Sequence, residues 1–244
     1  MNNKAVFFDV DDTLYDHLSP LRSALMEVLG LPEDFPYERA YYLFRYYSDL
    51  LSDEEGLSAV PDKSKMERMR TRRFILSLAE LGVHVTEEQA GRLQAAYLRG
   101  QFEIRPFEGA VTLIRRLSEA GYVVGLITNG PKEHQMSKIL AMEMEKLVPL
   151  SHIFVSGAVG IAKPDPRLFT HVNASTGTLA ADCHYIGDSW RNDVVGSLGA
   201  GWTSIWFNHR GAKPESDHTP HYIVSTFEEI GTLYGVNEVH KGTN

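Results

Sequence analysis

The chain has 244 residues, of which 43% are hydrophobic and 23% charged, a composition typical of a soluble globular protein with one large domain or a domain with an insert. Its formal net charge of −8 disfavours nucleic acid as a partner, and no apolar run approaches the length needed to cross a membrane. A single cysteine excludes an intrachain disulfide and, without a recognisable signal peptide, favours a cytoplasmic location.

The first predicted strand is the apolar run from Ala5 to Phe8. The following stretch, residues 16–104, carries helical patterns only, at 18–29, 37–51, 65–81 and 87–102. This stretch predicts a helical insert after the first strand. We expect its own core to contain the aromatic cluster Tyr41, Tyr42, Phe44, Tyr46 and Tyr47.

Four more apolar runs of strand length follow the insert, and helical patterns separate them. The predicted strands are 122–127, 153–155, 183–186 and 203–207. The predicted helices are 108–120, 132–147 and 166–173. Strands that alternate with helices indicate an α/β fold with a parallel sheet covered by helices on both faces. The polar end of the chain, 237–244, is predicted to be a frayed tail.

Polar side chains gather where the predicted strands end. In chain order they are Asp9, Asp11 and Asp12, then Thr128 and Asn129, then Lys163, and last Asp188 and Asp193. Each alone is better explained as a helix cap, a turn residue or a surface lysine. Ligands of open parallel sheets bind at the carboxyl ends of the strands, so the joint pattern predicts one crevice built from four segments.

The predicted crevice suits a metal ion and a phosphate group. Asp9 and Asp11 are two residues apart and point to the same side of an extended chain, and Asp188 adds a third carboxylate. Like charges raise one another's pKa, and a hard dication such as Mg²⁺ resolves the conflict. Lys163 and the Thr128 hydroxyl are donors suited to phosphate oxygens, and a nucleophilic carboxylate can form an aspartyl-phosphate.

Four motifs in this order resemble the haloacid dehalogenase-like (HAD) hydrolase superfamily. They are F-F-D-V-D-D-T-L at 7–14, L-I-T-N-G at 126–130, the lysine of A-K-P-D-P at 162–166, and G-D-S-W-R-N-D at 187–193. The resemblance implies a Rossmann-like catalytic core, 1–15 and 105–236, with a helical cap inserted at 16–104. The stretches D-D-T-L-Y-D-H and T-N-G-P-K-E-H-Q look most like the pyrimidine 5′-nucleotidase and N-acylneuraminate-9-phosphatase branch.

The resemblance also implies a catalytic role for four residues. Asp9 is the nucleophile that takes the phosphoryl group. Asp11 is the general acid that protonates the leaving oxygen and later the base that activates water. Thr128 holds a phosphate oxygen, and Lys163 pairs with Asp9 and the transferred phosphate.

Further residues are implied to assist. Asp188 binds Mg²⁺ together with Asp9 and the backbone carbonyl of Asp11. Asn129 helps to bind the phosphate through its backbone, and Asp193 orients Lys163 or a metal-bound water. Asp12 is interpreted as a turn residue without a catalytic role.

The resemblance implies a Mg²⁺-dependent phosphatase that acts on a small phosphorylated metabolite, a nucleoside 5′-monophosphate or a sugar phosphate. The acid at Asp11 favours phosphate-ester hydrolysis over dehalogenation, because displacing halide needs no proton donor. A phosphomutase and a non-catalytic protein that binds phosphometabolites stay open as alternatives. We expect no nucleic-acid or membrane partner and a monomer or homodimer. Cap arginines at 22, 45, 70 and 73 are candidates for substrate contact.

Overall fold

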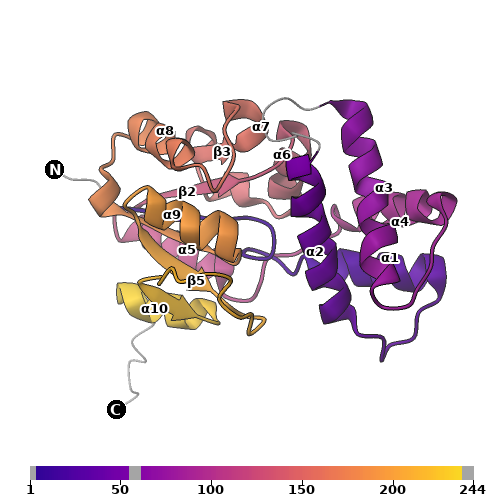
Figure 1. Ribbon diagram of the computed structural model, residues 1–244. Coiled ribbons are helices and arrows are strands. Elements are labelled where there is room, and N and C mark those ends of the chain that lie inside the picture. The colour runs from indigo at the N-terminus through magenta and orange to yellow at the C-terminus, as the bar shows by residue number, and fades with distance from the viewer. Residues whose placement is uncertain (1–3, 55–61, 238–244) are drawn as a thin grey trace, which may run out of the picture. The chain divides into compact units, whose positions relative to one another are not determined.

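The structure is a computed structural model that describes residues 4–54 and 62–237. The chain divides into two compact units, each shown in Figure 1. One unit comprises Met1–Tyr15 and Pro106–Asn244, and the other comprises Asp16–Arg105. The assignment of these units as catalytic core and cap stays a prediction. All but the first residue of the predicted tail, 237–244, lies outside the described residues.

The first unit is built on a six-stranded parallel sheet with the order β3-β2-β1-β4-β5-β6. The strands are β1 Ala5–Phe8, β2 Val123–Thr128, β3 Ile153–Val155, β4 Cys183–Gly187, β5 Thr203–Phe207 and β6 Tyr222–Val224. The predicted α/β class with a parallel sheet is confirmed. The sequence pattern missed β6, a three-residue edge strand whose Tyr222 and Ile223 are exposed, because so short a strand carries no readable alternation.

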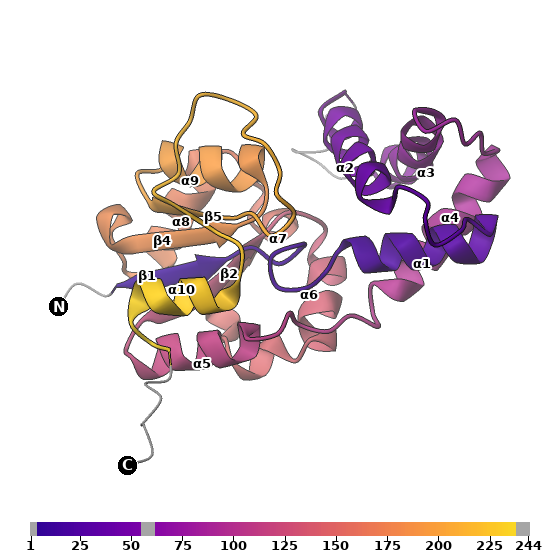
Figure 2. The same cartoon turned by 90° about the horizontal axis from the view of Figure 1, so that it is seen from below.

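Helices cover the sheet on both faces, with α5 and α10 on one side and α8 and α9 on the other (Figure 2). The helices of this unit are α5 Ala110–Glu119, α6 Lys132–Ala141, α7 Ser156–Val159, α8 Pro166–Thr176, α9 Gly196–Gly199 and α10 Phe227–Tyr234. The helix predicted at 132–147 is too long. α6 ends at Ala141, Glu143 adopts the left-handed φ of 57°, and a short 3₁₀ turn follows.

The register of the strands determines where the residues that follow them lie. β1 is buried along its whole length and lies between β2 and β4, with Phe8 opposite both Leu126 and Ile186. The backbone N–H of Asp9 continues this pairing by donating to the Ile186 carbonyl at 2.9 Å. The residues that follow β1, β2 and β4 therefore begin at the same edge of the sheet.

The described residues of the second unit form four helices, α1 Leu18–Leu29, α2 Tyr37–Glu54, α3 Lys63–Ala79 and α4 Glu87–Gly100. Local signals explain their ends: Gly30 closes α1 in the left-handed conformation, Asp62 caps α3, and Thr86 forms a capping box with Gln89 at α4. The four helices agree with the helical stretches expected at 16–104.

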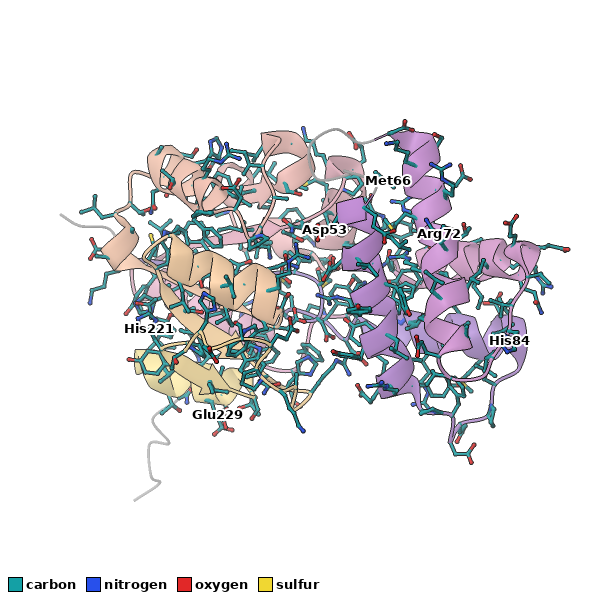
Figure 3. All side chains as sticks on the ribbon, in the orientation of Figure 1. Asp53, Met66, Arg72, His84, His221 and Glu229 are labelled. Atoms are coloured by element: carbon teal, nitrogen blue, oxygen red, sulfur yellow. The ribbon has the colours of Figure 1, made fainter. Side chains whose placement is uncertain are left out.

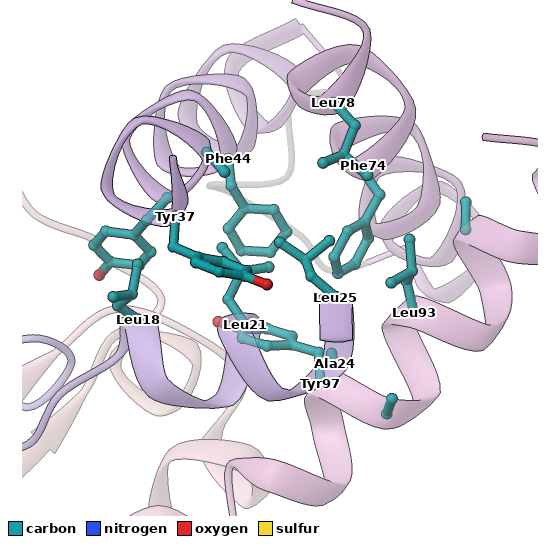
Figure 4. Close-up of a cluster of buried hydrophobic side chains, with 14 residues drawn as sticks. Leu18, Leu21, Ala24, Leu25, Tyr37, Phe44, Phe74, Leu78, Leu93 and Tyr97 are labelled. Atoms are coloured by element: carbon teal, nitrogen blue, oxygen red, sulfur yellow. The ribbon is translucent and has the colours of Figure 1, made fainter. Parts of the chain in front are cut away.

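Aromatic and leucine side chains from all four helices form the core of this unit (Figure 4). The ring of Phe44 lies 4.8 Å from that of Phe74 and 5.2 Å from that of Tyr97. The prediction that the aromatic cluster of α2 lies in this core is therefore correct only in part. Tyr41 and Phe44 are buried, whereas Tyr42 and Tyr46 are 53% and 52% exposed, since they lie on the outer side of α2.

Candidate active site

Several charged side chains of the first unit are buried. Other side chains, such as those of Arg72, His84 and Glu229, lie exposed on the surface (Figure 3). Among the described residues, the buried aspartates and lysines are Asp9, Asp12, Lys138, Lys163 and Asp193. They all belong to the first unit and follow strands of its sheet. Ionised groups are rarely buried without a partner, and concentrations of them mark functional sites.

Lys163 lies at the centre of these buried side chains. Its Nζ donates to Asp9 Oδ1 at 2.6 Å, to Asp193 Oδ1 at 2.7 Å and to the Tyr185 hydroxyl at 2.7 Å. Its side chain and those of both aspartates are less than a tenth exposed. Three sequence-predicted residues from distant segments therefore meet in one buried ion cluster.

The cluster perturbs the pKa of its members. Burial raises the pKa of Asp9 to about 7, and the nearby Asp193 and Asp11 add to this effect while Lys163 opposes it. For Lys163, burial alone would lower the pKa, but the charges of Asp193 and Asp9 raise it above its ordinary value. Lys163 therefore stays charged, and burial disfavours the ionised form of Asp9, which a further cation would favour.

A metal ion fits beside this cluster. Carboxylate oxygens of Asp9, Asp188 and Asp193 all lie within 4.8 Å of one another, and hard oxygen donors are what Mg²⁺ prefers. Asp193 is already engaged, because its Oδ1 accepts from Lys163 and its Oδ2 accepts from the Ser189 N–H at 2.9 Å. Asp9 and Asp188 are therefore the better placed of the three to hold a divalent cation.

Asp11 lies in a separate set of contacts. Lys138 Nζ donates to its two oxygens at 2.8 and 3.0 Å, Gln135 Nε2 donates to Oδ2 at 2.9 Å, and the Tyr15 hydroxyl donates to Oδ1 at 2.6 Å. No role was expected for Lys138, Gln135 or Tyr15. The spacing of Gln135 and Lys138 could have indicated one, because these polar residues lie three apart on the face of α6 that also buries Ile139.

Thr128, the last residue of β2, and Asn129, which follows it, connect the two sets of contacts. The Thr128 hydroxyl accepts from Gln135 Nε2 at 2.6 Å. The Asn129 side chain forms two hydrogen bonds of 2.9 Å with the backbone N–H and carbonyl of Lys163. Asn129 thus positions Lys163, an arrangement that the sequence analysis did not foresee. Its predicted contact with substrate through the backbone stays a prediction.

Asp12 is a turn residue, as interpreted from the sequence, and adopts a left-handed φ of 64°. It is also a buried ion-pair partner, which the sequence did not reveal. Arg210 Nε and a terminal guanidinium nitrogen each lie 2.7 Å from its carboxylate, and His209 Nε2 lies 3.0 Å from its carbonyl oxygen. Burial alone would raise the pKa of Asp12, but hydrogen bonds from Arg210 and His209 hold it well below its usual range.

We expect Arg210→Met to lower the free energy of unfolding by about 3 kcal/mol, because it leaves the Asp12 carboxylate buried without its bidentate partner. Urea denaturation at neutral pH measures this. The matched control is Arg167→Met, which removes an exposed arginine that pairs with Asp165 and should leave stability nearly unchanged. Equal losses in the two variants would contradict the prediction. The effect should persist down to the ordinary pKa of aspartate and shrink as pH falls below it toward the lowered pKa of Asp12.

Gly187, the last residue of β4, gives Asp193 the room to reach Lys163. A Cβ atom at residue 187 would collide with the Asp193 carboxylate. We expect Gly187→Ala to displace Asp193 and to reduce both thermal stability and turnover. The matched control is Gly91→Ala in α4, where a Cβ meets open space and should stabilise the helix by about 0.5–1 kcal/mol. A Gly187→Ala variant as active and stable as wild type would refute this account.

His17 and Trp190 lie in structural roles. His17 is buried at the start of α1 in the helical unit, with Nδ1 3.2 Å from the Tyr41 hydroxyl and Nε2 3.0 Å from Gln101 Nε2. Trp190 packs its ring 4.7 Å from that of Trp206.

Among the described residues no helix is long and apolar enough to cross a membrane.

Comparison with known proteins agrees with the four motifs. The haloacid dehalogenase-like hydrolase family matches this chain over residues 3–201. The chain belongs to this family, and the protein is therefore an enzyme of the hydrolase class. The resemblance inferred from the motifs is confirmed.

Relatives match over nearly the whole chain. The chain is 29% identical to glyceraldehyde 3-phosphate phosphatase of Pyrococcus abyssi, with 99% of this chain and 96% of that protein covered. It is 27% identical to N-acylneuraminate-9-phosphatase of Rattus norvegicus, with 94% and 93% covered. A crystal structure of a dehalogenase with an intermediate complex has a TM-score of 0.75 at 19% identity, covers 95% of this chain and 97% of that one, and shows the shared fold.

Proposed function

We propose that this protein is a Mg²⁺-dependent phosphatase that hydrolyses small phosphomonoesters through an aspartyl-phosphate on Asp9. The observation that carries the proposal is the geometry of Asp9. Its Oδ1 lies 2.6 Å from Lys163, and its carboxylate lies within 4.8 Å of those of Asp188 and Asp193. A buried carboxylate beside a fixed ammonium group and a cation site suits attack on an anionic phosphoryl group.

In the proposed first step an oxygen of Asp9 attacks phosphorus. The bond between phosphorus and the ester oxygen breaks, and the leaving oxygen takes a proton from Asp11. Thr128 donates a hydrogen bond to a phosphate oxygen, and Lys163 neutralises part of the charge on Asp9 and the phosphoryl group. Asp193 keeps Lys163 in place through their 2.7 Å contact.

In the proposed second step Asp11, now ionised, takes a proton from water. The water oxygen attacks the phosphorus of the aspartyl-phosphate, which releases inorganic phosphate and regenerates Asp9. Mg²⁺, held by Asp9, Asp188 and the Asp11 backbone carbonyl, would supply positive charge to the phosphoryl oxygens. These roles follow the family resemblance, and the contacts of Lys163 with Asp9 and Asp193 support them.

The substrate class rests on the relatives and on Asp11. The names of the two relatives above concern a triose phosphate and a phosphorylated sialic acid, both small hydroxylated metabolites. Their alkoxide leaving groups need a proton, which an acid at Asp11 provides. We therefore propose a sugar phosphate or a nucleoside 5′-monophosphate as substrate.

The test is release of inorganic phosphate from a panel of sugar phosphates and nucleoside monophosphates, with and without Mg²⁺, for wild type and Asp9→Asn. Release that depends on both Mg²⁺ and Asp9 supports the proposal. An isomerised sugar phosphate without free phosphate would point to a phosphomutase. Binding of panel members without any turnover would point to a non-catalytic protein. Either of these two results would overturn the proposal.

A further inference from the structure

Helix α6 places the ammonium group of the buried Lys138 directly beside Asp11. The Lys138 side chain is only 3% exposed, yet its ammonium group lies 2.8 and 3.0 Å from the two oxygens of the Asp11 carboxylate. Burying a lysine costs free energy, and an apolar residue would fill the same face of α6 without that cost. The burial of Lys138 is therefore best explained by the effect of its ammonium group on Asp11.

Gln135, one helical turn earlier on α6, holds the same carboxylate from a second direction. Its Nε2 donates to Asp11 Oδ2 at 2.9 Å, to Thr128 Oγ1 at 2.6 Å and to the Asn129 carbonyl at 2.7 Å. Asp11 Oδ2 and the Asn129 carbonyl only accept hydrogen bonds, so Nε2 is the atom that faces them. Gln135 thus links the Asp11 carboxylate to Thr128, the hydroxyl proposed to bind phosphate.

The two contacts together fix where the carboxylate sits. An aspartate side chain has two rotatable bonds, and two other carboxylates, Asp9 and Asp12, lie close to Asp11 in the chain. Without Lys138, the Asp11 carboxylate would keep the neutral donors Gln135 and Tyr15 but would lose the ammonium group that offsets these negative charges. Lys138 is bound to both oxygens, and Gln135 and Tyr15 each to one, so the carboxylate is restrained in position and in orientation.

We propose that Lys138, assisted by Gln135, is the positioning residue for the proton that Asp11 gives to the leaving oxygen. This inference rests on the proposed function, because it concerns the acid–base residue of that reaction. Through these two side chains, α6 holds the Asp11 carboxylate where the leaving oxygen arrives. Lys138 itself touches neither the substrate nor the phosphoryl group.

The experiment uses two esters that differ in their need for a proton. One is the best sugar phosphate or nucleoside monophosphate from the panel, whose alkoxide leaving group must be protonated. The other is 2,4-dinitrophenyl phosphate, whose phenolate leaves without a proton. We expect Lys138→Met to lower kcat/KM, which reports formation of the aspartyl-phosphate, by about 100-fold for the first ester and by less than about fivefold for the second.

Three further variants complete the design. Lys138→Arg keeps a positive charge beside Asp11 and should restore part of the lost kcat/KM for the first ester. Gln135→Met should show the same ester dependence with a smaller loss, and it carries the test if Lys138→Met does not fold. The matched control is Lys132→Met, an exposed lysine on the same helix, which should leave both rates unchanged.

The outcomes separate this inference from the proposed function. Equal losses of kcat/KM for both esters in Lys138→Met and Gln135→Met would mean a merely structural role and overturn the inference, as would no loss for either. In both cases a wild type that depends on Mg²⁺ and Asp9 would leave the proposed function standing. A wild type that hydrolyses neither ester would overturn both.

Discussion

Phosphate release will fall by at least about ten-thousand-fold when Asp9 is replaced in the Asp9→Asn variant, because the amide cannot form the acyl phosphate. The same loss should apply to activated and to alkyl phosphomonoesters, since both require the nucleophile. Steady-state phosphate release at saturating Mg²⁺ measures it. Residual activity within tenfold of wild type would rule out Asp9 as the nucleophile.

Stability measurements show whether this loss reflects chemistry rather than unfolding. Burial raises the pKa of Asp9 to about 7, above its ordinary value near 4, so the folded state favours the protonated acid. In metal-free protein, stability contributed by that acid is present below about pH 4 and is lost as pH rises through about 7. Asp9→Asn should therefore be as stable as wild type at pH 4 and more stable at pH 8. Added Mg²⁺ should stabilise wild type more than the variant.

Lys163→Met is expected to lower the free energy of unfolding by about 3–5 kcal/mol and to abolish turnover. The lysine is the shared partner of Asp9 and Asp193, and its removal leaves two buried carboxylates facing each other. Denaturant titration in metal-free buffer measures the first effect, and phosphate release with Mg²⁺ measures the second.

Two variants make the Lys163 experiment specific. Lys146→Met removes an exposed lysine that pairs with Glu143 and should leave stability unchanged. The double variant Lys163→Met with Asp193→Asn removes one of the two stranded carboxylates and should recover part of the lost stability without recovering turnover. A Lys163→Met variant as stable as wild type would show that the cluster is not an obligatory ion pair.

Much of the fold was predictable because its signals are local. The strands at β1 and β5 and the helix α1 begin and end where apolar patterns begin and end, and caps such as Gly30 act within one turn. The end of α6 was not predictable, since its helical pattern continues through residue 147 and only the left-handed backbone at Glu143 stops the helix. The edge strand β6 depends on pairing with β5, which no local pattern records.

By itself, the sequence determined the order and the chemistry of the candidate site. Asp9, Thr128, Lys163 and Asp188 each follow an apolar run, and parallel strands bring such positions to one edge of a sheet. Only the tertiary structure decided which groups neutralise these acids. Lys138 pairs with Asp11 across 127 residues and Arg210 with Asp12 across 198. The physical reason is that an ion pair depends on distance in space, and side chains so far apart in the chain share no periodicity from which that distance can be inferred.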